Sequence, residues 1–476
     1  MRVTVAKLVV SVLAMMAAAP LQAETLADAM VAAYKNSKLL EQNQALLRVQ
    51  DENVAQAVAT LRPVVRFVTE SRYAHSEVPV VLPANALLGT PAQYLGRTDT
   101  ETLDTTMQLV AQMTLLDFGR NRTSLEIAKE TVLATREALR AAEQRVLLEA
   151  VNAYVSVRLQ QEILALRQNN VRVIGQELQA ARDRFDVGEV TRTDVAIAEA
   201  SLAAAQSGLA SAQGDLTVAR ERYKAVTGAY PGDLAALPAL PEMAKTVESA
   251  REIALVTHPL INQKKREVTV ADLSVTAARA NMRPSLTGTA ALSTQAEGDP
   301  DRVESASVGL SLSQTIYAGG ALSSGYRQAV ARRDAARADL AQTAITLGED
   351  VGVAWSQVQV AQASISAGDQ QIEAARTAFD GVREEATLGA RTTLDVLDAE
   401  QNLLDARATR ATAAAKRYVG VYNLLATMGL MTVDHLKLGV PSYDPAVYYE
   451  AVRRAPVTSP QGKALDRLLG KVGGAD

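Results

Sequence analysis

The chain contains an internal duplication, which restricts its fold to two copies of one structural unit. Residues 25–63 align without a gap with residues 246–284, and residues 114–228 align in the same way with residues 315–429. The offset is 221 residues for the first pair of blocks and 201 residues for the second. Identical matched residues include Thr25 and Thr246, Gln42 and Gln263, Pro63 and Pro284, Gly188 and Gly389, Glu199 and Glu400, and Gly228 and Gly429. Both copies are therefore expected to fold in the same way.

The two offsets differ because the first copy has 20 additional residues between its aligned blocks, around residues 77–100. This stretch contains Pro79, Pro83, Pro91 and two glycines, so the sequence predicts an extended loop. Insertions of this kind are tolerated best at an exposed tip.

Residues 1–23 have the pattern of a secretory signal peptide. Arg2 and Lys7 precede or flank an apolar run over residues 8–19, and Ala23 is a small residue suited to cleavage. A buried N-terminal helix is the alternative. Without this segment the formal net charge changes from −4 to −6, so no basic excess suggests nucleic acid. The chain has no cysteine, which excludes disulfides, thiolate metal sites and a lipid anchor on cysteine.

Alternating apolar and polar residues predict strands in both copies. The pattern extends over residues 64–73, 102–115 and 307–316. Segments of about ten residues like these are typical of lipid-facing barrel strands. The half-buried sheet of a water-soluble protein gives the same alternation, so the pattern alone leaves both structures open.

Long helices make up most of each copy. In the first copy we predict helices over residues 26–61, 121–184 and 192–226, the first of them ended by a proline. The second copy repeats the long pair over residues 323–385 and 392–428. Apolar residues recur at every seventh position of the first long helix, which indicates coiled-coil-like packing.

No apolar run after residue 23 reaches the roughly 18 residues that a membrane-spanning helix requires. If the chain spans a membrane, it must do so with a β-barrel, the other structure that pairs all its backbone groups in lipid. Four strands cannot close a barrel, since the smallest natural barrels have about eight. Several chains would then share one barrel, to which a trimer would contribute 12 strands. The predicted fold class is mainly α, with a coiled-coil helical barrel and four strands per chain.

In the order of its elements and in several short motifs, the chain resembles the TolC family of outer-membrane efflux and secretion channels. The resemblance extends over about residues 25–449. The motifs are Arg62-Pro63 and Arg283-Pro284 before the strands, residues 314–320 (QTIYAGG) after them, residues 185–188 (FDVG) with 193–195 (TDV) at the first helical turn, and residues 389–398 (GARTTLDVLD) at the second.

The resemblance implies a homotrimer in the outer membrane of a Gram-negative bacterium, with a 12-stranded barrel in lipid and a helical barrel extending into the periplasm. It implies the exit duct of a tripartite efflux pump or a type I protein secretion system. The expected partners are a periplasmic adaptor (membrane fusion) protein, an inner-membrane pump or ABC transporter, and outer-membrane lipid. No enzyme activity, cofactor, metal or nucleic acid is expected.

The expected domains follow from the repeat and the resemblance. They are a signal peptide (residues 1–23), a first repeat (24–228), an equatorial linker (229–245), a second repeat (246–429), an equatorial C-terminal segment (430–455) and a disordered tail (456–476). The first repeat is expected to contain a helix, two strands with a long outer loop, and a helical hairpin.

By the same resemblance, a periplasmic gate is expected at the two helical turns. Thr193, Asp194 and Arg391 would form polar links there, and an Asp194–Arg391 pair between chains is the first candidate. Asp194 and Asp395 each follow a threonine by three residues, so helix capping also explains them. The family's gate has a tyrosine five positions before the arginine, where this chain has Ala386.

Asp398 follows Asp395 by three residues and shares its helix face. In a trimer these two residues would form stacked carboxylate rings at a narrow entrance, and such rings bind and select cations. A solvated helix face is the alternative.

The turns themselves are expected to be the docking surface for the adaptor. This surface comprises Val187, Gly188, Glu189, Leu388 and Gly389. The two glycines have a structural explanation as well, because a glycine permits the tight turn between two helices.

Two functions of other classes are the alternatives. A periplasmic coiled-coil scaffold would explain the helices but not the alternating segments at equivalent places in both copies. An exported enzyme would need a catalytic or metal cluster. The three histidines, His75, His258 and His435, lie far apart in the sequence and have no ligand spacing.

Overall fold

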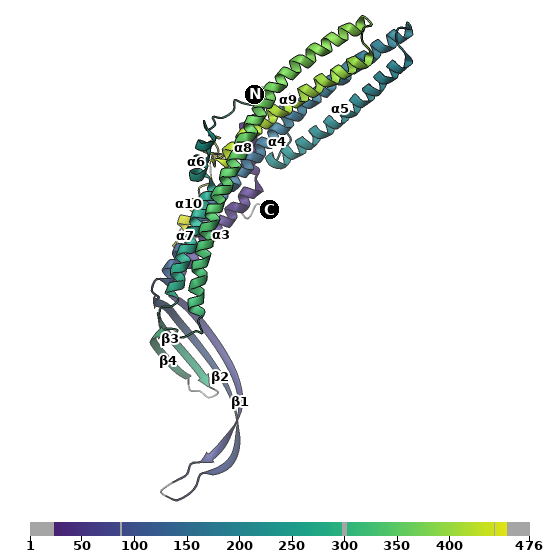
Figure 1. The fold of residues 1–476 in the computed structure, drawn as a ribbon. Coiled ribbons are helices and arrows are strands. Elements are labelled where there is room, and N and C mark those ends of the chain that lie inside the picture. Colours follow the sequence, from purple (N-terminus) through teal and green to yellow (C-terminus); the bar gives the residue numbers. More distant parts are fainter. Residues whose placement is uncertain (1–22, 86–87, 298–301, 442, 455–476) are drawn as a thin grey trace, which may run out of the picture. The chain divides into compact units, whose positions relative to one another are not determined.

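The computed structural model describes residues 23–85, 88–297, 302–441 and 443–454. The predicted signal peptide, except Ala23, and the predicted tail lie outside the described residues. In chain order the elements are α2 (Leu26–Asn36), α3 (Lys38–Ala59), β1 (Val64–Leu82), β2 (Gln93–Leu116), α4 (Arg120–Asp186), α5 (Arg192–Thr227), α6 (Val247–Thr257), α7 (Pro259–Ala280), β3 (Ser285–Glu297), β4 (Arg302–Ser313), α8 (Ala321–Thr387), α9 (Thr393–Thr427) and α10 (Pro445–Val452), as drawn in Figure 1.

The helices of the two copies match in length and in position. α2 and α6 have 11 residues each, α3 and α7 have 22 each, and all four keep the offset of 221 residues. α4 and α8 have 67 residues each and keep the offset of 201. The duplication predicted from the sequence is therefore confirmed element by element. None of the described helices is long and apolar enough to cross a membrane.

The single helix predicted over residues 26–61 is wrong, because the chain breaks at Ser37 into α2 and α3. Ser37 has an extended backbone (φ −69°, ψ 112°), and its hydroxyl accepts the Leu40 N–H at 3.3 Å. A serine that bonds to nearby backbone groups in this way competes with the helix. The second copy breaks at His258, where the following Pro259 disfavours helical backbone.

Each break is tied to the end of the hairpin in its own copy. The Asn36 side chain donates to the carbonyl of Thr227 at 2.5 Å, at the end of α5. The Thr257 hydroxyl donates to the carbonyl of Met428 at 2.5 Å, just after α9. These pairs occupy equivalent positions of the repeat, so the duplication extends to individual tertiary contacts.

The four strands form one antiparallel sheet in the order β1-β2-β3-β4. Its register places large apolar side chains on one face and mostly polar ones on the other. The apolar face consists of Val65, Phe67, Tyr73, Leu103, Met107, Leu109, Leu292, Val308, Leu310 and Leu312, all exposed in the single chain. Among the described residues, therefore, none covers this apolar face of the sheet.

The extended loop predicted around residues 77–100 is wrong, because most of this stretch continues β1 and β2. Pro79 lies opposite Arg97, and the register shifts between Val80 and Val81, near Gly96 with φ 124°. A proline is tolerated in β1 because this strand lies at the edge of the sheet, and the glycine allows the local bulge. The segment predicted over residues 307–316 also changes, since β4 spans Arg302–Ser313.

The compact units of the structure do not coincide with the two copies. One unit consists of the described residues within 1–46, 136–263 and 340–443, and the other of those within 47–135, 264–339 and 444–476. Each unit takes segments from both copies. The first contains the largest apolar core, in which Tyr154, Tyr223 and Leu424 are fully buried.

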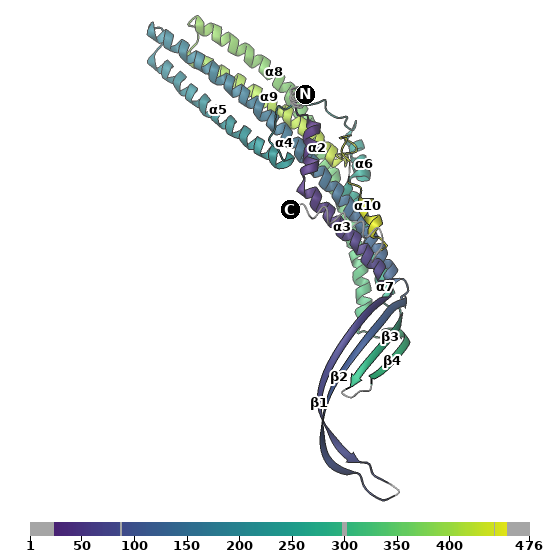
Figure 2. The same ribbon diagram turned by 180° about the vertical axis from the view of Figure 1, so that it is seen from behind.

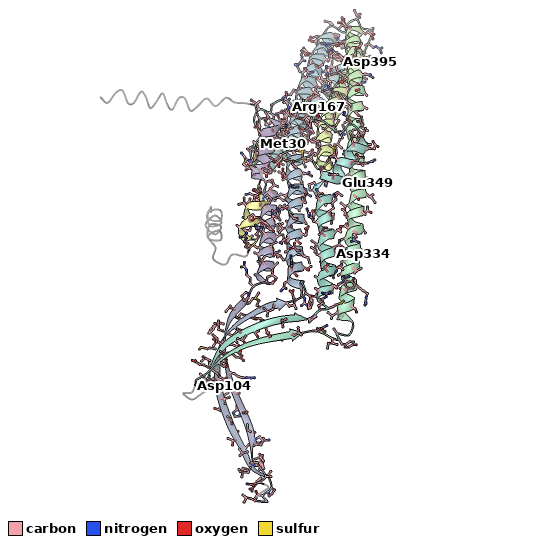
Figure 3. All side chains as sticks on the ribbon, turned by 90° about the vertical axis from the view of Figure 1, so that its left-hand side faces the viewer. Met30, Asp104, Arg167, Asp334, Glu349 and Asp395 are labelled. Atoms are coloured by element: carbon pink, nitrogen blue, oxygen red, sulfur yellow. The ribbon has the colours of Figure 1, made fainter. Side chains whose placement is uncertain are left out.

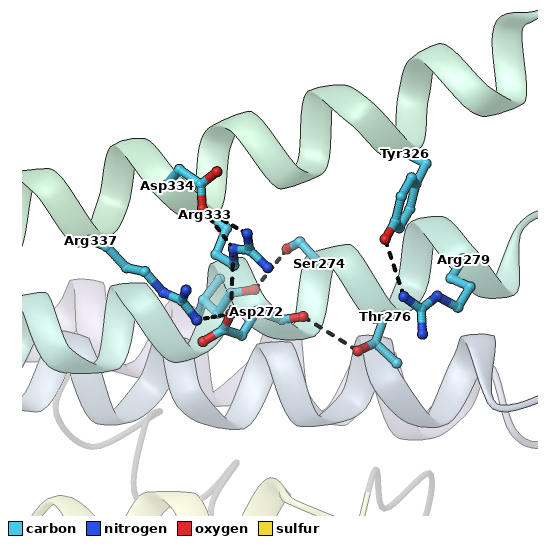
Figure 4. A network of polar contacts seen from close by, with 9 residues as sticks. Asp272, Ser274, Thr276, Arg279, Tyr326, Arg333, Asp334 and Arg337 are labelled. Atoms are coloured by element: carbon cyan, nitrogen blue, oxygen red, sulfur yellow. Dashed lines mark hydrogen bonds and ion pairs between the residues drawn. The ribbon is translucent and has the colours of Figure 1, made fainter.

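In the second unit, α7 and α8 are joined by charged and polar contacts, shown in Figure 4. The Asp272 carboxylate of α7 forms ion pairs with two arginines of α8. Its oxygen lies 3.0 Å from a guanidinium nitrogen of Arg337 and 4.0 Å from one of Arg333. Arg279 donates to the Tyr326 hydroxyl at 3.1 Å. These side chains are partly exposed, so the pairs contribute little to stability and mainly fix the register of the two helices.

The two glycines that follow the hairpins provide a matched test of this packing. Gly228 and Gly429 both have positive φ, 89° and 78°. A Cβ on Gly429 would lie 2.7 Å from the His258 backbone, whereas one on Gly228 would meet only the Asn36 side chain, at 2.9 Å.

The substitution Gly228→Ala should lower the free energy of unfolding by roughly 1–2 kcal/mol through backbone strain. Gly429→Ala should cost more, roughly 3 kcal/mol in total. Thermal unfolding of the two purified variants measures the difference; equal losses would contradict the backbone contact.

Candidate functional site

Four long helices of the first unit lie side by side in the order α8, α9, α4, α5 (Figures 1 and 2). α4 and α9 are the inner helices, and α5 and α8 lie at the two edges. Leu397 of α9 packs among apolar residues of α4 and α5, and Val173 of α4 packs against the core between α8 and α9. The two hairpins, α4/α5 and α8/α9, therefore share a packed boundary up to their turns.

The turns have the same geometry in both hairpins. Gly188 and Gly389 have φ of 84° and 75°, a conformation that favours glycine. Beyond each helix end the chain bonds back to it, with N–H to O distances of 2.9 Å for Glu189 to Arg184 and for Ala390 to Glu385. Val187 and Leu388, at the tops of the turns, are among the most exposed apolar residues. Adaptor docking at this surface stays a prediction.

Each return helix begins with a complete capping box. The Asp194 carboxylate accepts the Thr191 N–H at 2.9 Å and hydroxyl at 2.7 Å, and Asp395 does the same with Thr392 at 2.9 and 2.8 Å. These bonds hold the pKa of both carboxyls below the ordinary value of 3.8. A lowered pKa means that the caps are intact above this value and are lost only as the pH falls through the lower one. Figure 3 shows Asp395 near the end of its hairpin.

Within the chain, Arg391 is paired with Glu385 rather than with Asp194. The Nε–Oε2 distance is 2.8 Å, and this hydrogen bond, with the nearby charges of Glu385 and Asp395, raises the pKa of Arg391. Both side chains are half exposed, so an exchange of partners costs little. An Asp194–Arg391 pair between chains stays a prediction. Of the other predicted gate residues, Thr193 and Asp398 are exposed.

Three polar links between α4 and the second hairpin were not found from the sequence. Glu177 of α4 is buried, and its carboxylate forms an ion pair with Arg383 of α8 at an N–O distance of 3.2 Å. Asn170 of α4 donates to Glu400 of α9 at 3.4 Å, and both residues are buried. Arg184 donates to the Ala386 carbonyl at 3.4 Å. The sequence signal that could have indicated the first two is the seven-residue spacing of Asn170 and Glu177, which places them on one helix face.

Ala386 lies in the apolar core of the second hairpin. It is buried and packs with Phe379, Val396 and Leu403. At the position where the family's gate has a tyrosine, this chain therefore has a small core residue. The Ala386 carbonyl accepts the Gly389 N–H at 3.2 Å and the Arg184 side chain at 3.4 Å.

Comparison with known proteins explains this arrangement. The family model "Outer membrane efflux protein" matches residues 29–229 and again residues 250–430. The chain belongs to the outer membrane efflux protein family. The two matches correspond to the two copies of the repeat.

Relatives of known sequence and structure support the same family. The outer membrane efflux protein BepC of Brucella suis is 36% identical over 434 residues, which cover 90% of this chain and 91% of that protein. Outer membrane protein TolC of Escherichia coli is 27% identical over 62% of this chain and 63% of its own length. The crystal structure of the Campylobacter jejuni CmeC outer membrane channel has a TM-score of 0.73 at 18% identity, covering 90% of this chain and 89% of its own, and shows the same fold.

Membership of the family confirms the main predictions made from the sequence. The chain is an outer-membrane exit duct of the efflux and secretion class, extends into the periplasm and is not an enzyme. The alternative of a non-channel scaffold is thereby excluded. The resemblance to the TolC family and the mainly helical fold with a few strands are confirmed as well.

Removal of one cap should loosen the second turn. Thr392→Ala removes the hydroxyl that accepts the Asp395 N–H and donates to the Asp395 carboxylate. Loss of this cap should destabilise the start of α9 by about 1 kcal/mol. Hydrogen–deuterium exchange in the first turn of α9 should therefore accelerate about fivefold. Thr377→Ala is the control, because that exposed hydroxyl bonds only to Glu373 within α8. Unchanged exchange in Thr392→Ala would contradict the capping role.

Proposed function

We propose that three copies of this chain form one duct, with 12 strands closed into a barrel in the outer membrane and the helical turns at the periplasmic entrance. The observation that supports this proposal is the open sheet. β1 and β4 each have only one neighbour among the described strands, and the apolar face is uncovered. Strand edges cannot remain unpaired in lipid, so neighbouring copies must pair with them.

The edge helices support the same assembly. The buried residues of α5 are mostly one row of alanines, Ala198, Ala205, Ala212 and Ala219, and its other faces are largely exposed. α8 exposes Val353 and Val360 beside a groove of about 1370 Å³ between α4, α8 and α9. We infer that α5 of one copy covers α8 of the next.

The duplication predicts the contacts at this interface. Within the chain, α9 of the second copy packs on α4 of the first. α5 and α8 are the equivalents of α9 and α4 in the repeat. If neighbouring chains join by the same contact, α5 of the next chain packs on α8 as α9 packs on α4. The buried pair of Asn170 and Glu400 then has its counterpart in Gln371 of one chain and Glu199 of the next, each offset by 201 residues.

A cysteine pair tests this interface, and the natural chain has no cysteine that could interfere. Gln371→Cys/Glu199→Cys should cross-link into covalent trimers with a short bifunctional maleimide in outer membranes. Gln371→Cys with Glu221→Cys is the control, because Glu221 lies about 33 Å further along α5. Cross-linking in the control alone, or monomers only in both, would contradict the arrangement.

We further propose that Asp395 and Asp398 line the entrance as two rings of three carboxylates. Asp395 is half-buried within its cap and keeps a lowered pKa, so it is charged at neutral pH. Asp398 is exposed one turn further along α9. Thr193, Asp194 and Arg391 are the proposed polar links between chains at the same level. In this chain Arg184 and Arg383 supply links where the tyrosine is absent.

Single-channel recording tests the carboxylate rings. In planar lipid bilayers, a trivalent cation should block the wild-type duct from the periplasmic side. Asp395→Ala/Asp398→Ala should weaken this block by 100-fold or more, because six carboxylates are removed. Glu189→Ala, on the exposed first turn, is the control and should keep the block. Unchanged block in the double variant would rule out the rings.

The turns are the proposed docking surface for a periplasmic adaptor, which would connect the duct to an inner-membrane pump or ABC transporter. This surface exposes the apolar side chains of Val187 and Leu388 on a fixed backbone, which suits a protein partner. It comprises Val187, Gly188, Glu189, Leu388 and Gly389. Recovery of an adaptor from native membranes with the wild-type chain, and its loss with Val187→Asp/Leu388→Asp, would support this role. Equal recovery with both chains would oppose it.

A further inference from the structure

The two hairpins contain the same pair of charged residues in different surroundings. Arg182 and Glu199 of the first hairpin correspond to Arg383 and Glu400 of the second, each at the offset of 201 residues. In the first hairpin these residues form an ion pair between α4 and α5, with an N–O distance of 2.6 Å. Both side chains are about half exposed.

In the second hairpin, the equivalent residues contact α4 instead. Among the contacts of the described residues, Arg383 pairs with Glu177 at 3.2 Å, and Glu400 accepts a hydrogen bond from Asn170 at 3.4 Å. Arg383 and Glu400 are thus not paired with each other, although both are present.

Glu400 is the less favourably placed of the two groups. It is 5% exposed, and burial raises the pKa of its carboxyl, while Arg407 and Arg172 oppose this rise and Glu177 adds to it. Asn170 donates to Glu400 through its amide nitrogen. Its amide oxygen, Oδ1, is buried and accepts no hydrogen bond among the described residues. A carboxylate in this position gains less than it would in an ion pair with Arg383.

The backbone of the second hairpin allows that pair. α8 ends and α9 begins at the same offset of 201 residues from α4 and α5, and both turns have a glycine with positive φ and a complete capping box. Residues 383 and 400 therefore lie across their hairpin as residues 182 and 199 lie across theirs. The pairing that Arg182 and Glu199 form is therefore open to Arg383 and Glu400 as well.

We propose that Arg383 and Glu400 are a partner-exchange switch for the entrance: they hold the α8/α9 hairpin on α4 in the state described here, and they pair with each other when the hairpin moves away. The exchange would leave neither charge unpaired in the open state. Without it, Arg383 and Glu400 would be hydrated separately after the hairpin moves, and the open state would lack the modest stabilisation of an exposed ion pair. The first hairpin already has its internal pair, Arg182 with Glu199, in the state described here. This inference rests on the proposed function as a gated duct.

Two substitutions of the same kind should act in opposite directions. Glu177→Gln weakens the hold of α4 on Arg383, so the open fraction should rise several-fold. Glu400→Gln replaces the carboxylate by an amide, which can bond to both polar atoms of Asn170 but cannot form an ion pair, so the open fraction should fall several-fold. The measurement is the open probability of the purified full-length protein in planar lipid bilayers. Glu373→Gln, an exposed carboxylate of α8 outside these contacts, is the control and should leave it unchanged.

A second comparison does not depend on the buried amide. Arg383→Glu alone and Arg383→Glu/Glu400→Arg both lose the attraction to Glu177, but only the double variant can form the pair within the hairpin. The double variant should therefore be open several-fold more often than the single one.

The outcomes separate the switch from the duct. If wild-type channels form and Glu400→Gln opens as often as the wild type or more often, or the double variant opens no more than Arg383→Glu, the two residues are static links and the switch is overturned. If the wild-type protein forms no channel, the proposed function fails and the switch fails with it.

Discussion

Backbone groups that lie in lipid must all be hydrogen-bonded, and this chain cannot meet that requirement alone. Its sheet has four strands, two open edges and one exposed apolar face. Pairing β1 of one copy with β4 of the next would satisfy the edges and would arrange the copies in a ring. The helices must then follow the same ring, so the exposed sides of α5 and α8 become contacts between copies.

Duplication supplies the parts of this ring but places them in different environments. Both hairpins have the same lengths, turns and caps, yet α4 and α9 are inner helices while α5 and α8 lie at the edges. The pair Arg182–Glu199 can therefore stay exposed within its hairpin, whereas Arg383 and Glu400 meet the facing side of α4. One repeated motif provides a fixed hairpin in the first copy and a hairpin with two alternative sets of contacts in the second.

Local signals in the sequence were sufficient for the elements and the caps. The long helices and the caps at Asp194 and Asp395 depend on neighbours within a few residues, and the structure has them as predicted. The break at Ser37 and the strand pairing of Pro79 were missed because tertiary contact and an edge position outweigh local preference there. The link from Asn170 to Glu400 joins residues 230 positions apart, so the seven-residue spacing of Asn170 and Glu177 indicates a shared helix face but not the partner.

The central claim is that neighbouring copies close the sheet. Electron cryomicroscopy of the full-length protein, extracted from outer membranes into lipid nanodiscs, tests it most directly. The account predicts three copies around one axis, with β4 of each hydrogen-bonded to β1 of the next inside the lipid disc and α5 of each packed against α8 of a neighbour. A single copy, or several copies whose four-stranded sheets remain separate, would contradict it.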